Sequence, residues 1–191
     1  MVWSMDAMSD EIRRQLAEAA KKHQFTRIVR TLPGSDEIEG FVISVTPSWT
    51  LVTECNSLTL NGFVALRTRD IVKVRRRGTG DLMVRWLQRH GPWPPPGPSG
   101  AISQADVRSL MESAGRQYQL ISVLQEDLDP DVVYIGAPVR WGKNRLRLLE
   151  VNPRARWANA PSSFRYDDIT RVDFGDRYST ILGSLAGPPP Q

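Results

Sequence analysis

The sequence predicts a mainly β protein with some α-helix, an α+β fold in which a helix followed by five short strands occurs twice. Three observations predict it. A proline-rich stretch near the middle divides the 191 residues into halves of similar length. Each half opens with a helical apolar pattern and continues with short alternating segments separated by turn residues. The two series of segments also match in order, which indicates an internal repeat.

The proline-rich stretch is predicted to be a linker. Five of the eight residues from 91 to 98 are proline, which cannot donate a backbone hydrogen bond and favours an extended chain. We therefore expect a first domain at 1–90, a linker at 91–100 and a second domain at 101–187. A second proline run follows Gly187, so residues 188–191 are expected to form a frayed tail.

Each domain is predicted to open with a helix. In the first half the apolar pattern runs from residue 9 to about 23 and brings Ile12, Leu16 and Ala19 to one face. In the second half we expect a helix with Ser103 as its N-cap and Gly115 as its stop. Acidic residues early and lysines late in the first pattern fit the helix dipole.

Two further helical or apolar segments follow the predicted strands. A short helix at 81–90 would trail the first domain, and Leu82, Met83, Trp86 and Leu87 would form one apolar face that packs on it. After residue 173, a turn at Gly175 and the apolar residues beyond it predict a C-terminal segment that folds back on the protein.

The strands are predicted from runs of β-branched and apolar residues bounded by turn residues. In the first half they are expected at 25–32, 38–45, 50–55, 58–66 and 71–75. In the second half they are expected at 118–124, 132–139, 145–151, 157–166 and 169–174.

Two landmarks align the halves. Gly40 and Gly136 lie inside the second strand of each half, where a glycine marks a bend or a close backbone approach. Asp70 and Asp168 directly precede the last strand. Because both aspartates recur at the same place in the repeat, we interpret them as turn residues and not as a catalytic pair.

This order of elements, with a glycine in the second of five bent strands, resembles the Sm-like fold, a small SH3-like barrel. The resemblance implies two tandem barrels, and it implies RNA binding where the residues support it. In Sm proteins an Arg-Gly pair before the last strand and an Asp and an Asn after the second strand form the RNA pocket. Only Arg69 matches, and no glycine follows it, so the pocket is not carried over. The tandem arrangement resembles uncharacterised bacterial two-barrel proteins, which imply no established activity.

The net charge of +4 lies entirely in residues 1–92, which hold 14 basic and 10 acidic residues. The densest basic run is at 73–77, so the first domain is where a nucleic acid would bind. The alternative is a solvated strand edge that discourages pairing with other strands. The candidate nucleic-acid-binding cations are Arg69, Lys73, Arg75, Arg76 and Arg77.

Two tryptophans lie at or beside the turns between the second and third strands of the two halves. Trp49 could stack a base beside the basic run. Trp141 lies beside Arg140, Lys143 and Arg145, so Trp141 and Lys143 could contact a base or a partner protein. The alternative is that each tryptophan caps the end of its barrel and is buried.

The composition argues against several classes of protein. One cysteine, Cys55, excludes an internal disulfide, and with only His23 and His90 beside it no usual zinc site can form, so we expect no metal and no cofactor. Cys55 is expected to be a buried, inert thiol. Gly78-Thr79-Gly80 lacks the lysine of a phosphate-binding loop and is interpreted as a turn. No apolar stretch is long enough to cross a bilayer, and a cytoplasmic protein is expected.

Three functional hypotheses follow from the sequence. The leading hypothesis is a non-enzymatic binding or assembly module that recruits a protein partner or a second copy of itself. The alternative is RNA or DNA binding through the basic surface of the first domain. A carboxylate enzyme is the third hypothesis, and no motif in the sequence supports it.

Overall fold

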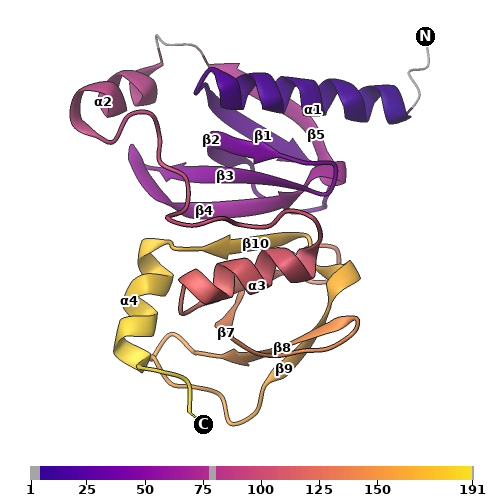
Figure 1. The fold of residues 1–191 in the computed structure, drawn as a ribbon, viewed down its shortest axis with the longest axis vertical. Coiled ribbons are helices and arrows are strands. Elements are labelled where there is room, and N and C mark those ends of the chain that lie inside the picture. Colours follow the sequence, from indigo (N-terminus) through magenta and orange to yellow (C-terminus); the bar gives the residue numbers. More distant parts are fainter. Residues whose placement is uncertain (1–4, 78–80, 191) are drawn as a thin grey trace. The chain divides into compact units, whose positions relative to one another are not determined.

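The computed structural model describes residues 5–77 and 81–190 of the chain. The chain divides into two compact units, Met1–Gly97 and Pro98–Gln191, and the boundary falls within the range expected to be a linker. Each unit combines helices with an antiparallel sheet (Figure 1). The turn predicted at Gly78-Thr79-Gly80 lies outside the described residues.

The first unit contains two helices and five strands. They are α1 (Met5–Lys21), β1 (Phe25–Arg30), β2 (Ile38–Val45), β3 (Trp49–Asn56), β4 (Thr59–Arg67), β5 (Ile71–Arg77) and α2 (Leu82–His90), with a 3₁₀ turn at Thr68–Asp70. Within this unit the strands lie in the order β5-β1-β2-β3-β4. All five predicted strands are present, and the one predicted at 38–45 is confirmed at both ends.

The second unit repeats this plan. It contains α3 (Val107–Gln117), β6 (Ile121–Leu124), β7 (Tyr134–Trp141), β8 (Arg145–Glu150), β9 (Ser162–Arg165), β10 (Arg171–Phe174) and α4 (Arg177–Ala186), with a 3₁₀ turn at Tyr166–Asp168. Within this unit the strands lie in the order β10-β6-β7-β8-β9, which is the order of the first unit with each strand replaced by its counterpart.

The repeat extends to single residues. Gly40 of β2 lies opposite Glu54, and Gly136 of β7 lies opposite Glu150. A β-bulge follows each glycine at the same distance, between Val42 and Ser44 in β2 and between Pro138 and Arg140 in β7. Asp70 and Asp168 each end the 3₁₀ turn before the last strand. The alignment predicted from these glycines and aspartates is therefore confirmed in the register of the strands.

Neither sheet closes on itself. Among the described residues no ladder joins β4 to β5 or β9 to β10, so each unit has an open sheet. Bulges and glycines bend the strands, because an extra residue in one strand increases its local twist. The sequence predicted two closed barrels, but in the part of each unit that the structure describes, hydrogen bonds between strands do not form a closed ring.

The first sheet carries an apolar cluster on each face. Alternation along β1 sends Ile28 to one face and Phe25 to the other. On the first face α1 packs Ile12, Leu16 and Ala19 against the sheet. On the second face Phe25, Phe41 and Cys55 contact three residues of α2 and the linker tryptophan, namely Met83, Val84, Leu87 and Trp93. Both faces of this sheet are therefore covered by helices from its own unit.

The helix predicted at 81–90 is confirmed as α2, but its buried face differs from the prediction. Met83, Val84 and Leu87 are buried, whereas Leu82 is 65% exposed and Trp86 45% exposed. Residues 83, 84 and 87 share one stripe of the helix, and positions 82 and 86 lie beside that stripe. The expectation that Trp86 is a core residue was therefore wrong.

The ends of α3 also differ from the prediction. The N-cap is Asp106, whose side chain accepts a hydrogen bond from the Ser109 backbone N–H at 2.8 Å, and not Ser103. The helix passes through Gly115, where a Cβ would lie 3.1 Å from Cγ of Pro138 in β7. Gly115 thus lets α3 approach β7 closely and does not end the helix.

The strand predicted at 157–166 is reduced to β9. A single bridge joins Val151 to Trp157, and regular pairing starts only at Ser162. The Asn152 side chain accepts hydrogen bonds from the backbone N–H groups of Arg154 and Arg156, which holds the intervening chain in a turn. Side-chain hydrogen bonding to the local backbone therefore replaces sheet pairing here.

The C-terminal segment folds back as predicted, in the form of α4. Asp176 caps the helix by accepting from the Ser179 backbone N–H at 2.8 Å. Leu182 of α4 packs with Leu120, Ala137 and Val151 of the same unit. The Trp157 indole donates to the Ala186 carbonyl at 3.2 Å, which ties the end of α4 to the turn after β8.

We expect the Gly40→Ala and Gly136→Ala variants to lower the free energy of unfolding by roughly 1–3 kcal/mol each. In either variant the added methyl would collide with a neighbouring backbone carbonyl oxygen, that of Thr53 or Leu149. Gly97→Ala is the control, because its Cβ would lie at an ordinary 3.5 Å from Ile43. Urea unfolding of the full chain measures the difference. Equal midpoints for all three variants would contradict the proposed role of the glycines.

Candidate functional site

The predicted basic run lies on β5, the terminal strand of the first sheet. Lys73, Arg75 and Arg77 alternate along β5, so they share one side of it, and all three are exposed. We call these three residues the β5 face. Their partners on β1 are Val29, Arg27 and Phe25 in register.

Two cations of the run, Arg76 and Arg77, form ion pairs. Arg76 pairs with Glu18 of α1 at 2.5 Å. Hydrogen bonds from Lys22 and Arg76 lower the pKa of Glu18 to about 2. Arg77 contacts Asp81 at 3.4 Å and lies 5.9 Å from the centre of the Phe25 ring. Within the described part of the chain, Lys73 and Arg75 have no ion pair.

Arg69 is exposed but does not form a pocket. It stands in the 3₁₀ turn before β5 and approaches the Asp70 carboxylate only to 3.9 Å. Arg67 makes the closer pair with Asp70, at 2.5 Å, and both side chains are largely buried. Asp70 thus holds the turn through a buried ion pair, which agrees with its interpretation as a structural residue.

Trp49 cannot serve as a stacking surface. It is the first residue of β3, opposite Arg67, and it is only 4% exposed. The Thr46 hydroxyl accepts a hydrogen bond from its backbone N–H at 3.0 Å and fixes the turn that precedes it. A base needs a free aromatic face, so the expectation that Trp49 stacks a base is wrong, and the alternative of a buried tryptophan is correct.

An exposed aromatic pair that the sequence did not reveal lies on α2. The rings of Trp86 and His90 are 4.2 Å apart between centroids and 35° from parallel. Arg85 and Arg89 are also exposed on this helix. Spacing alone made Trp86 a candidate core residue, and only the packing of α2 shows that its ring lies outside.

Trp141 does not form one site with the neighbouring arginines. Lys143 is exposed in the turn between β7 and β8. Trp141 is half-buried and lies opposite Leu146, whose other neighbour is Phe164. Because side chains alternate along a strand, Trp141 lies on the side of these buried residues and not on the side of Arg140.

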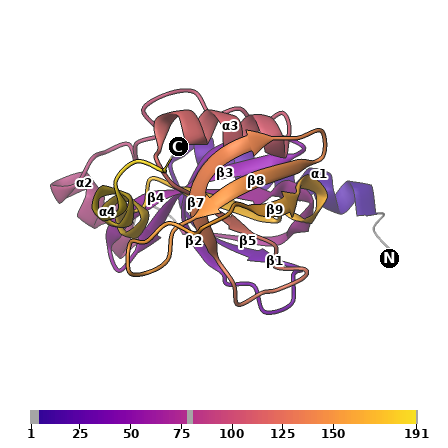
Figure 2. The same cartoon turned by 90° about the horizontal axis from the view of Figure 1, so that it is seen from below.

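Four arginines lie on one face of β7, β8 and β9. Arg140 is directly opposite Arg147, and Arg145 is directly opposite Arg165. Arg145 and Arg147 are two residues apart on β8, so all four share one side of the sheet. All four are exposed. We call them the arginine face, and its three strands lie side by side in Figure 2.

The sequence contained a signal for the arginine face that the charge count concealed. The second half is neutral overall, with 11 basic and 11 acidic residues after position 92. The alternation Arg145-Leu146-Arg147 already places two arginines on one side of a strand. Their partners Arg140 and Arg165 come from strands whose register only the structure defines.

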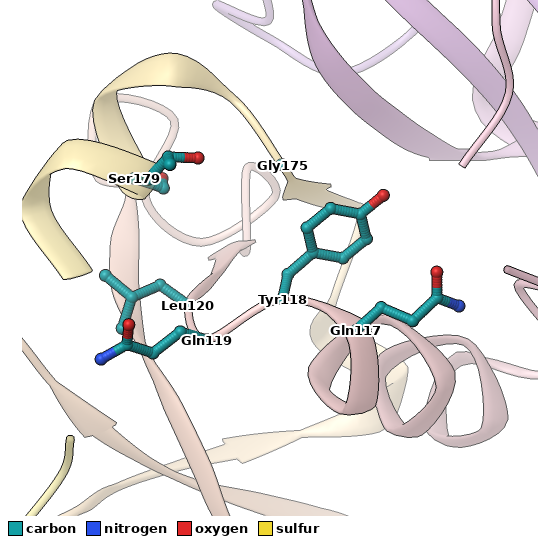
Figure 3. Close-up of a pocket in the computed structure, with 7 residues that line it drawn as sticks. Gln117, Tyr118, Gln119, Leu120, Gly175 and Ser179 are labelled. Atoms are coloured by element: carbon teal, nitrogen blue, oxygen red, sulfur yellow. The ribbon is translucent and has the colours of Figure 1, made fainter. Parts of the chain in front are cut away.

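A small pocket lies between the end of α3, the start of β6 and the first turn of α4 (Figure 3). Its volume is about 180 Å³, and its polar side chains hold the fold. The Gln119 amide donates to the Gly187 carbonyl at 2.6 Å, and the Gln117 amide donates to the Ala101 carbonyl at 3.1 Å. Burial raises the pKa of Tyr118. The lining residues are Gln117, Tyr118, Gln119, Leu120, Gly175, Ser179 and Thr180.

Metal-binding clusters and membrane-spanning helices are not found in the described residues. In residues 5–77 and 81–190, no three His, Cys, Asp or Glu side chains are gathered as a metal site. No helix in the same residues has the length and apolar character needed to cross a membrane. Comparison with protein-family models, curated proteins and solved structures finds no match to this chain.

We expect Cys55 to resist thiol reagents in the folded protein. It is buried in β3, and burial together with nearby carboxylates raises its pKa to about 12. Only the thiolate reacts, so at about pH 8 the folded protein should react far more slowly with iodoacetamide than the protein in urea. Mass spectrometry of the alkylated protein measures both rates. Rapid modification without denaturant would show that the thiol is accessible.

Proposed function

We propose that this chain is a non-enzymatic binding protein built on two tandem Sm-like units, and that its first unit binds nucleic acid. The repeated order of helix and five strands supports the Sm-like interpretation. The glycine and bulge in the second strand of each unit support it further, because they bend the strand as a small barrel requires. No solved structure matches the chain, so the Sm-like interpretation is supported only by these features of the chain itself.

The observation that carries the proposal is the β5 face. Three cations project from one side of one strand, and two of them, Lys73 and Arg75, have no ion pair among the described residues. Cations two residues apart on a strand are separated by about 6.6–6.8 Å, so each can meet a different phosphate. Neutralising phosphates releases condensed counterions, which favours binding without sequence preference.

The outer side of α2 extends this surface. Arg77 connects the two elements, because it contacts Asp81 at the start of α2 and lies over Phe25, which packs on α2. Beyond it the adjacent, tilted rings of Trp86 and His90 offer an exposed aromatic surface. Aromatic rings beside cations bind unpaired bases, so we propose that the first unit prefers single strands.

We expect the triple variant Lys73→Gln, Arg75→Gln, Arg77→Gln to bind nucleic acid with a weaker salt dependence. The slope of log affinity against log salt should fall by about one unit for each phosphate that the variant no longer neutralises. The control replaces three exposed cations in or directly after α1, Arg14, Lys21 and Lys22, by glutamine and changes the net charge equally. Fluorescence anisotropy with labelled oligonucleotides measures both slopes. Identical slopes in the two triple variants would exclude the β5 face.

We expect Trp86→Ala to weaken single-strand binding by about 1–3 kcal/mol, the usual contribution of one stacked base. Duplex binding should change little, since paired bases are not free to stack. Trp86→Phe keeps an aromatic surface and should restore most of the affinity. If the single-strand affinity of Trp86→Ala is unchanged, α2 is not part of the binding site, and the proposed site is the β5 face alone. If the unmodified chain instead retains a protein or dimerises without binding nucleic acid, the assembly hypothesis replaces this proposal.

A further inference from the structure

The arginine face is a surface of the second unit to which the proposed function assigns no role. We propose that Arg140, Arg145, Arg147 and Arg165 form a second, independent surface that binds the phosphate backbone of a nucleic acid. Four observations support this surface: the register of the arginines, their exposure, their few acidic neighbours and the different residues at the same positions of the first unit.

The register places like charges directly against each other. Arg140 opposes Arg147 across β7 and β8, and Arg145 opposes Arg165 across β8 and β9. Like charges at directly opposed positions of an antiparallel pair destabilise the sheet. Two such pairs on three neighbouring strands therefore do not serve the stability of this unit. A bound polyanion would convert the repulsion into attraction.

Acidic neighbours do not neutralise the arginine face. Arg165 approaches Asp167 at 3.9 Å and Asp168 at 3.8 Å, both near the limit for an ion pair. Within residues 5–77 and 81–190, Arg140, Arg145 and Arg147 have no ion pair at all. Lys143 adds a further exposed cation in the turn between β7 and β8.

The first unit shows that the fold does not require these arginines. In the shared register, Trp49 stands at the position of Arg145 and Leu51 at the position of Arg147, and both Trp49 and Leu51 are buried. On the same side of β3, the Thr53 hydroxyl donates to the Pro96 carbonyl at 2.8 Å, so the proline-rich segment packs on this side of the first sheet. The second unit carries charge where the first carries apolar side chains. The arginine face is therefore specific to the second unit.

The chemistry of the face fits a phosphate backbone better than a protein. Each guanidinium presents a planar fork of donors that matches phosphate oxygens in pairs. The central row of the face runs from Arg140 through Arg147 to Ser163, so its middle is cationic and its end is a hydroxyl. Single arginines are common in protein interfaces, but the centre of such an interface consists mainly of apolar and aromatic side chains and holds few charges in total. Opposed arginines within a row are one strand spacing apart, about 4.7–4.9 Å, so they can share one phosphate or meet two.

The test compares two double variants of the full chain. One is Arg140→Gln with Arg147→Gln, which removes one opposed pair. The control is Arg154→Gln with Arg156→Gln, which removes two exposed arginines of the turn after β8 and changes the net charge equally. Labelled oligouridylate is the probe, and anisotropy is read across a salt series. We expect Arg140→Gln/Arg147→Gln, and not the control, to lower the slope of log affinity against log salt. The decrease should be at most about two units, one for each lost phosphate contact.

Stability gives a readout that separates binding from folding. Removing the opposed pair relieves repulsion, so the melting temperature of Arg140→Gln/Arg147→Gln should equal or exceed that of the unmodified chain. Arg147→Glu should raise it further by placing opposite charges across the strands, while it weakens binding more. Weaker binding together with a lower melting temperature in both variants would mean that the arginines support the fold, which would overturn the proposal.

The outcomes also separate this surface from the first one. If the triple β5 variant retains salt-dependent binding that Arg140→Gln/Arg147→Gln removes, the arginine face binds by itself and the β5 face does not. If the arginine variant behaves like the Arg154/Arg156 control, this proposal fails and the proposed function of the first unit stands. Polyglutamate or phosphatidylserine vesicles that compete as well as oligouridylate would overturn the assignment to nucleic acid.

Discussion

The close approach of two backbones at Gly40 and Gly136 is the constraint on which both sheets depend. At each position a neighbouring carbonyl oxygen occupies the space that a side chain would need. The bulge that follows each glycine inserts one extra residue, so the residues beyond it lie on the side opposite to the one that strict alternation would give them. That register defines which side chains share each face of the two sheets. The opposed pair Arg140 and Arg147 exists only because Arg140 lies beyond the bulge in β7.

The same fold handles charge differently in its two units. In the first unit Arg76 and Arg67 form ion pairs that tie strands to α1 or to a turn, and the exposed cations of the β5 face lie on the outer strand of the sheet. In the second unit Arg140, Arg145 and Arg147 gather on β7 and β8 without such pairing among the residues described. A duplicated architecture can carry two surfaces of different character, because sheet register needs only the alternation of buried and exposed positions.

Much of the first unit could be predicted from the sequence, because its strands contain long β-branched runs with clear turns. In the second unit the ends of some elements were harder to predict, because hydrogen bonds from side chains to the nearby backbone compete with the pairing of strands or change where a helix begins. Asn152 holds a turn that shortens β9, and Asp106 caps α3 three residues after the expected cap. The exposure of Lys73 and Arg75 could be predicted, because it follows from the alternation of side chains along a strand. Prediction failed for Trp49 and Trp86, whose exposure depends on what packs against them.

The sequence by itself determined the repeat, the element order, the structural role of the two glycines and the position of the basic strand. These features follow from local patterns such as alternation, turn residues and proline content. Only the tertiary structure decided which tryptophan is exposed and which arginines meet. Burial is a property of the neighbours that a residue acquires on folding, and cross-strand pairs join residues whose register no local pattern specifies. Arg147 and Arg165 therefore became candidates only after β8 was placed between β7 and β9.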